Sequence, residues 1–161
     1  MQLTVSDEIL CEIGRVAVSH SHLEGELALF IQELLRVAND ERGYILTFKM
    51  SFGEKVRVVR ALLRNEFGDK HAEFIRFEAV RKKAERANDR RNNIAHSMWG
   101  FGKDFQSNAA TRVKANENKL ADEALTTNDL RSIAQELQQL QWELSDIRAK
   151  LCHHEESARK F

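Results

Sequence analysis

The sequence predicts an all-α protein, an antiparallel bundle of four main helices with a loop or short β-hairpin inserted at about residues 99–125. The 161 residues contain no proline, although proline makes up about 5% of average sequences and a fold of many turns would hardly avoid it. Long segments repeat apolar residues with helical spacing, whereas glycine and asparagine punctuate residues 99–125. This length predicts a single domain over residues 1–161 with a real core.

The first helix is predicted over residues 6–37. Its apolar residues alternate spacings of four and three, which makes a heptad seam once His20 is included. The seam consists of Ile9, Ile13, Val16, Leu23, Leu27, Phe30, Leu34 and Val37. We therefore expect His20 in the core, with one ring nitrogen satisfied.

Two helices are predicted in the middle of the chain. Ser51 and Glu54 have the spacing of a capping box, which opens a helix that Gly68 stops after about Phe67. Asp69 is expected to cap a third helix, over residues 70–97. The apolar side of that helix consists of Phe77, Val80, Ala84, Ala87, Ile94 and Met98.

The same alternation of three and four residues predicts a last helix over residues 130–151. Thr126 or Thr127 can cap its start, and the negative charge of Asp129 complements the positive N-terminal end of the helix dipole. Its apolar side consists of Leu130, Ile133, Leu137, Leu140, Leu144, Ile147 and Leu151. Between the third and last helices, residues 111–114 alternate as a short exposed strand would. A small β-hairpin and an ordered loop both fit the insertion.

Composition indicates a soluble, cytoplasmic protein. Two cysteines, Cys11 and Cys152, suit a reducing compartment, and we see neither a signal peptide nor an apolar run long enough to cross a membrane. The net charge is zero, but residues 1–54 hold 4 basic and 9 acidic residues, whereas residues 55–96 hold 12 and 6. A polyanion would be attracted to the middle segment and repelled by the first helix.

Arg91, Asn92 and His96 are the candidate catalytic residues, near the end of the third predicted helix. Metal-free phosphodiester cleavage needs a fixed cation for the phosphate and a group that titrates near neutrality. Arg91 also falls on the apolar side, and such breaks of a local rule are expected at functional sites. The alternative is an arginine that spans the bundle to pair with an acidic partner.

Helix geometry predicts a homodimer. Arg91 and His96 point roughly 140° apart and lie about 7.5 Å apart along the axis, whereas Asn92 and His96 share a face. One helix cannot easily bring Arg91 and His96 to a single atom unless it ends or bends there. Two copies related by a twofold axis could supply converging pairs.

Arg91 is followed directly by the polar Asn92, and four residues separate it from His96. This pattern resembles the signature of the HEPN superfamily of all-helical RNases. Residues 97–100, Ser-Met-Trp-Gly, are similar to the continuation seen in many bacterial members. The resemblance covers residues 91–100 in detail and most of the chain in helix order and length. It implies a homodimer with both motifs facing one cleft, acting as a toxin or defence component under the control of an antitoxin or other regulatory protein.

The resemblance also implies a chemistry that needs no metal or cofactor. The 2′-hydroxyl of RNA attacks the adjacent phosphorus and gives a 2′,3′-cyclic phosphate and a 5′-hydroxyl. Arg91 would bind the phosphate, His96 would act as general acid or base, and Asn92 would orient His96 or hold a phosphate oxygen.

Other readings remain open. The chain could be a catalytically silent HEPN-like bundle that binds a protein or nucleotide. A basic strip before the motif fits both an RNA contact and an ordinary solvated face, and it consists of Lys82, Lys83, Arg86 and Arg90. The groups at residues 20–22 and 152–154 contain histidine but provide no four-ligand set, so we expect no metal site.

Overall fold

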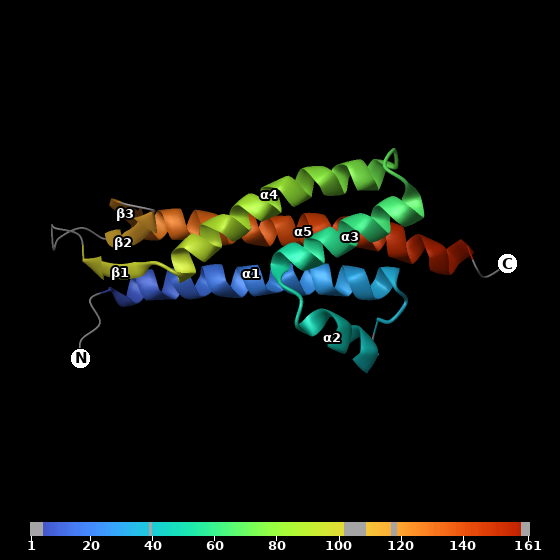
Figure 1. The fold of residues 1–161 in the computed structure, drawn as a ribbon, viewed down its shortest axis with the longest axis horizontal. Coiled ribbons are helices and arrows are strands. Elements are labelled where there is room, and N and C mark those ends of the chain that lie inside the picture. Colours follow the sequence, from blue (N-terminus) through green and yellow to red (C-terminus); the bar gives the residue numbers. More distant parts are fainter. Residues whose placement is uncertain (1–4, 39, 102–108, 117–118, 159–161) are drawn as a thin grey trace. The chain divides into compact units, whose positions relative to one another are not determined.

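A computed structural model describes residues 5–38, 40–101, 109–116 and 119–158, and it confirms the predicted all-α bundle with a β insertion (Figure 1). The elements of this part of the chain are α1 (Asp7–Leu34), α2 (Glu41–Phe48), α3 (Phe52–Phe67), α4 (Ala72–Ala95), β1 (Met98–Phe101), β2 (Ala109–Asn116), β3 (Lys119–Thr126) and α5 (Thr127–Ala158). No described helix is both long enough and apolar enough to span a membrane.

The chain divides into two compact units, which we describe separately. The first unit consists of Met1–His20 and Ala87–Leu137, and the second consists of Ser21–Arg86 and Gln138–Phe161. The helices α1, α4 and α5 contribute residues to both. A single domain over residues 1–161 stays a prediction.

The predicted apolar seams form the core. In α5 all seven seam residues are buried, and so are the α4 residues Phe77, Val80, Ala84, Ala87 and Ile94. The buried seam residues of α1 are Ile9, Val16, His20, Leu23, Leu27 and Phe30. In the second unit the rings of Phe30 and Phe77 meet edge to face, with centroids 6.4 Å apart. Helical periodicity therefore identified the interior.

The helix boundaries follow local capping chemistry, with one correction. Ser51 and Glu54 form the predicted capping box, and Gly68 ends α3 with a φ of +79°, a conformation that glycine adopts without strain. The third long helix begins at Ala72 and not near Asp69. There the Nδ1 atom of His71 accepts a hydrogen bond from the amide of Glu73 at 3.2 Å, whereas Asp69 pairs with Arg64. The predicted cap at Asp69 is therefore wrong.

The insertion in the first unit forms an antiparallel sheet in the order β1-β2-β3. The expected strand at residues 111–114 lies within β2, and β2 pairs with β3 in antiparallel fashion, which is the hairpin rather than the ordered loop of the two forms that the sequence allowed. The sheet also has a strand that the sequence did not predict, β1. This strand pairs with β2 in a register that sets Trp99 opposite Arg112. Thr126 ends β3 and accepts the amide of Asp129, as a cap of α5 should.

Acidic residues of α1 form ion pairs with arginines of α5. In the first unit the buried Glu12 accepts from Arg131 at 2.8 Å. In the second unit Arg148 donates to Glu26 at 2.6 Å and also to Glu33, one heptad further along α1. Flanking ion pairs at heptad spacing are typical of helices packed side by side.

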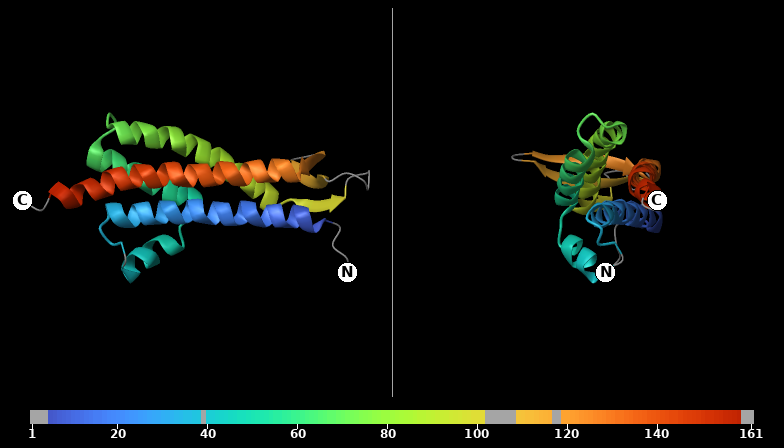
Figure 2. Two further views of the ribbon diagram at one scale, coloured as in Figure 1. Left: turned by 180° about the vertical axis from the view of Figure 1, so that it is seen from behind. Right: turned by 90° about the vertical axis from the view of Figure 1, so that its right-hand side faces the viewer.

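Helix α2 was not predicted. In the second unit it lies outside α1, on the flank away from α4 (Figures 1 and 2). Asp40 caps it, and its contact with the end of α1 includes a 3.0 Å hydrogen bond from Gln32 to the buried Thr47. Gly43 lets α2 lie close to the turn that follows α1, because a Cβ atom at this position would lie 2.4 Å from the carbonyl oxygen of Val37 in that turn.

We predict that Gly43→Ala lowers the free energy of unfolding by about 1–3 kcal/mol, the usual cost of overpacking. Gly14→Ala is the matched control, because a Cβ there meets nothing within 4 Å and alanine stabilises a helix interior by about 1 kcal/mol relative to glycine. Urea denaturation measures both. Equal stability of the two variants would contradict the close approach.

We predict that Arg148→Met costs about 3 kcal/mol or more, because it leaves the buried Glu26 and the half-buried Glu33 without their cation. Arg57→Met serves as the control, because Arg57 is exposed and, among the described residues, its guanidinium donates only to the Gly53 carbonyl. The control should change the unfolding free energy by less than about 0.5 kcal/mol. If both substitutions have the same small effect, the cluster contributes no stability.

Candidate functional site

The predicted catalytic segment lies at the end of α4 in the first unit. Arg91 and Asn92 belong to the last helical turn, and His96 follows the last helical residue, Ala95. The helical bonding continues for one residue more, since the amide of His96 donates to the carbonyl of Asn92 at 3.0 Å. The motif thus lies on continuous helix as far as its last residue, so the helical geometry that separates Arg91 from His96 still applies.

Side-chain donors form hydrogen bonds with the backbone carbonyls at the C-terminal end of α4. The hydroxyl of Ser97 donates to the carbonyl of Asn93, and the indole Nε1 of Trp99 donates to the carbonyl of Ile94 at 2.9 Å. Terminal helix carbonyls have no helical partner and need such donors. Ser97 and Trp99 therefore fix the passage from α4 into β1 beside His96.

Arg91 is half-buried. It lies on the apolar side of α4, between the buried residues Ala87 and Ile94. Its Nη1 atom donates to Oδ1 of Asn92 at 3.0 Å. Its Nε atom is buried and has no acceptor. No carboxylate among the described side chains forms an ion pair with Arg91. The alternative that it spans the bundle to an acidic partner therefore finds no support there and stays open.

Most other arginines have a carboxylate partner, which makes Arg91 unusual. Ion pairs are formed by Arg15, Arg36, Arg42, Arg60, Arg64, Arg76, Arg81, Arg90, Arg131 and Arg148. Arg57 and Arg86 have none in the described part of the chain, but both are exposed. Arg91 is the half-buried arginine without a counter-ion there.

Asn92 and His96 complete the predicted trio. Asn92 is half-buried and uses its oxygen for Arg91, so its amide NH₂ is the group left to face His96 or a phosphate. His96 is exposed, and no described residue hydrogen-bonds its ring. The structure therefore shows a contact between Arg91 and Asn92 and shows no protein group that orients His96.

A second polar contact precedes the motif by one helical turn. Nε2 of His20 on α1 lies 2.9 Å from Oδ1 of Asn88 on α4. This bond confirms that His20 is a core histidine with a satisfied ring nitrogen. Sequence reasoning missed Asn88, although its position four residues before Asn92 places both on one helix face. The bond anchors this part of α4 to α1.

Glu12 is another residue of the first unit that the sequence did not single out. It is buried, and its Oε1 atom is engaged by Arg131 and by Arg15 at 3.4 Å. Its Oε2 atom has no partner. The signal was its place between Ile9 and Val16, at helical spacing from both. The first unit thus contains a buried carboxylate as well as the open guanidinium of Arg91.

The basic strip is exposed but partly neutralised. Arg90, in the first unit, pairs with Glu136 at 2.5 Å. The pKa of the nearby Asp129 carboxyl is lowered, first by its hydrogen bond with Thr126 and further by the charge of Arg90. In the second unit Lys83 pairs with Glu143, whereas Lys82 and Arg86 have no acidic partner among the described residues. An RNA contact there stays a prediction.

Neither a metal centre nor a reactive Cys152 emerges from the described part of the chain. It contains no group of three histidine, cysteine, aspartate or glutamate residues that could hold a metal ion. Burial raises the pKa of the Cys152 thiol to about 12, so the group is protonated at neutral pH and is a poor nucleophile. Arg91, Asn92 and His96 remain the group with a recognisable chemistry.

Comparison of the chain with protein-family models, with curated proteins and with solved structures found no match. The HEPN resemblance therefore rests on residues 91–100 and on the order and length of the helices.

Proposed function

We propose that this protein is a metal-independent endoribonuclease of the HEPN type, in which Arg91 binds the scissile phosphate and His96 transfers protons. The observation that supports the proposal is the half-buried guanidinium of Arg91, which has an unsatisfied Nε and no carboxylate partner among the described side chains. A buried cation without a counter-ion destabilises the folded chain. An anionic ligand would remove that cost.

The bonding of Arg91 favours a phosphate as this anion. Nη1 is directed to Asn92, which leaves the edge formed by Nε and Nη2 without an acceptor in the described residues. Two parallel N–H groups on one edge of a planar guanidinium match two oxygens of a phosphodiester. Asn92 thus acts as a positioning residue that holds the guanidinium with this edge unpaired.

The proposed reaction needs one cation and one proton carrier. The 2′-oxygen forms a bond to phosphorus, the bond from phosphorus to the 5′-oxygen breaks, and the products are a 2′,3′-cyclic phosphate and a 5′-hydroxyl. The 2′-hydroxyl proton passes to a base and the leaving 5′-oxygen receives a proton, which are roles for the exposed imidazole of His96. Arg91 stabilises the charge on the phosphorane-like transition state. DNA lacks the 2′-hydroxyl and is not cut.

In this proposal the protein acts in the cytoplasm as a homodimer, with two copies contributing to one cleft, and serves as a toxin or defence component restrained by a partner protein. A second candidate is a catalytically silent bundle that binds another protein. The exposed apolar side chains of α2 favour this candidate. Cleavage of RNA by the purified protein separates the two.

We predict that the purified protein cuts total RNA in the presence of EDTA, and that Arg91→Ala and His96→Ala each lower the rate at least about 100-fold. Arg91→Lys should also lose activity, because lysine keeps the charge but lacks the planar edge. Arg57→Ala, which removes an exposed arginine without an ion pair, is the matched control and should cut like the parent.

Circular dichroism and urea denaturation verify that each variant is folded. If folded Arg91→Ala and His96→Ala variants cut RNA like the parent, the motif is structural. If cleavage stops in EDTA and returns with Mg²⁺ or Mn²⁺, the proposed mechanism is wrong.

A further inference from the structure

After its charged first turn, helix α2 exposes large apolar side chains. Tyr44, Ile45 and Phe48 are 61%, 70% and 63% exposed, and Leu46 is exposed as well. Only Gly43 and Thr47 of this helix are buried. A helix that is apolar around most of its circumference is normally buried. The outer side of α2 therefore has the composition of a contact surface.

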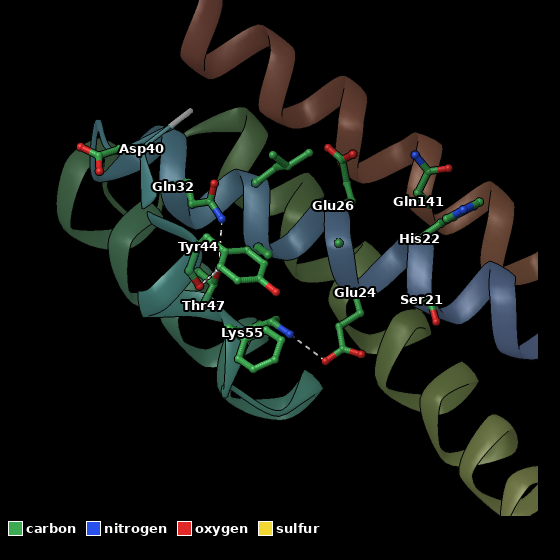
Figure 3. Close-up of a pocket in the computed structure, with 14 residues that line it drawn as sticks. Ser21, His22, Glu24, Glu26, Gln32, Asp40, Tyr44, Thr47, Lys55 and Gln141 are labelled. Atoms are coloured by element: carbon green, nitrogen blue, oxygen red, sulfur yellow. Dashed lines mark hydrogen bonds and ion pairs between the residues drawn. The ribbon is translucent and has the colours of Figure 1, made fainter. Parts of the chain in front are cut away.

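An open groove of about 720 Å³ lies beside these side chains, between α1 and α2 (Figure 3). Tyr44 and Phe48 form its α2 wall, with ring centroids 5.1 Å apart. On α1 the groove is lined by the exposed Leu29 and by the small residues Gly25 and Ala28. An apolar ridge and an apolar groove are therefore adjacent on one surface, which we call the α2 patch and define as Gly25, Leu29, Tyr44, Ile45 and Phe48.

No contact within the described part of the chain requires a glycine at position 25. It lies within α1, where glycine is less favourable than alanine, and a Cβ atom there would meet nothing within 4 Å. Small residues on a helix surface let another chain approach closely. The groove thus has space that no residue of the described chain uses.

The charged groups around the groove are already neutralised within the second unit. Glu24 pairs with the buried Lys55 at 2.7 Å (Figure 3), and Glu26 pairs with Arg148. Asp40 at the groove edge pairs with Arg42 at 2.5 Å. A charged partner would find little to complement here, and RNA would also meet the net negative charge of residues 1–54. Two identical neutral surfaces, in contrast, can face each other without repulsion.

We propose that the α2 patch is the surface through which two copies of this chain associate. In a twofold contact the same patch serves both copies and must be self-complementary. An adjacent ridge and groove meet this condition, because Ile45 and Phe48 of each copy can enter the groove of the other.

The size of the patch fits such a contact. Its four large side chains each expose on the order of 100 Å², or roughly 400 Å² together. A standard interface needs about 800 Å² per partner, of which about 65% is apolar in homodimers. The patch with its polar rim approaches this requirement.

This inference rests on the proposed function only in that a composite site needs two copies, because every observation for it comes from the second unit. Oligomeric state is measured without RNA, so the two proposals fail separately. A dimer that does not cut RNA overturns the proposed function alone. A monomer that cuts RNA overturns the α2 patch and the composite cleft, and leaves the roles of Arg91 and His96 in cleavage standing.

The test is light scattering and sedimentation velocity on the full chain from about 1 to 100 µM. The parent should be a dimer, and Ile45→Glu should raise the dissociation constant at least 100-fold. Ile75→Glu is the matched control, because Ile75 is also an exposed isoleucine, at 58%, but lies on α4 outside the patch. This control should remain a dimer.

A second pair of variants excludes unfolding as the cause. Gly25→Gln fills the groove with a residue that favours helix, so the chain should unfold at higher urea while its dimer dissociates at least tenfold more readily. Gly14→Gln, at the other unconstrained glycine of α1, should stabilise without affecting the dimer. A parent that is monomeric at 100 µM, or a dimer that neither Ile45→Glu nor Gly25→Gln weakens, would overturn the proposal.

Discussion

Burial of one apolar stripe along each long helix is the constraint on which the rest of the structure depends. Every seam residue of α5 is buried, and α4 buries the same kind of stripe from Phe77 to Ile94. A stripe of this kind fixes how each helix is rotated about its axis. Arg91 lies on the α4 stripe between Ala87 and Ile94, so the packing that buries these neighbours also carries the guanidinium into the edge of the core.

The chain compensates its other inward-facing charges. Arg148 is matched by Glu26 and Glu33, and the buried Glu12 is matched by Arg131. Within the described part of the chain, Arg91 receives only an amide oxygen, from its neighbour Asn92. Because compensation is the rule elsewhere, the missing counter-ion at Arg91 is the feature that most needs a functional explanation, and a bound phosphate provides one.

The long elements could be predicted from sequence because their signals are local and repeated. Heptad spacing identified the interior of α1 and α5, and the capping box at Ser51 with Gly68 identified the ends of α3. The short elements could not be predicted. Helix α2 depends on its contact with α1 through Gln32 and Thr47, and β1 depends on its pairing with β2. Both contacts join residues that are distant in the sequence. The start of α4 was misplaced because His71 supplies a cap for which sequence favoured Asp69.

For the candidate site, the sequence identified the residue types but not their bonding. The break of the apolar stripe at Arg91 was visible in the spacing, as was His20 in the core. Two facts needed coordinates: the buried, unpaired Nε of Arg91, and the bond between His20 and Asn88 that anchors α4. Both depend on rotamers and on groups from other helices, which no local pattern encodes.

The central claim is that the open edge of Arg91 holds a phosphodiester, and NMR of the arginine Nε–Hε groups tests it most directly. A short RNA with 2′-O-methyl groups provides the phosphates but cannot be cleaved through the 2′-oxygen. The Nε–Hε signal that disappears in Arg91→Lys should shift on titration with this RNA, while that of the exposed Arg57 stays in place. An unchanged Arg91 signal at saturating RNA, or shifts confined to exposed arginines, would contradict the account.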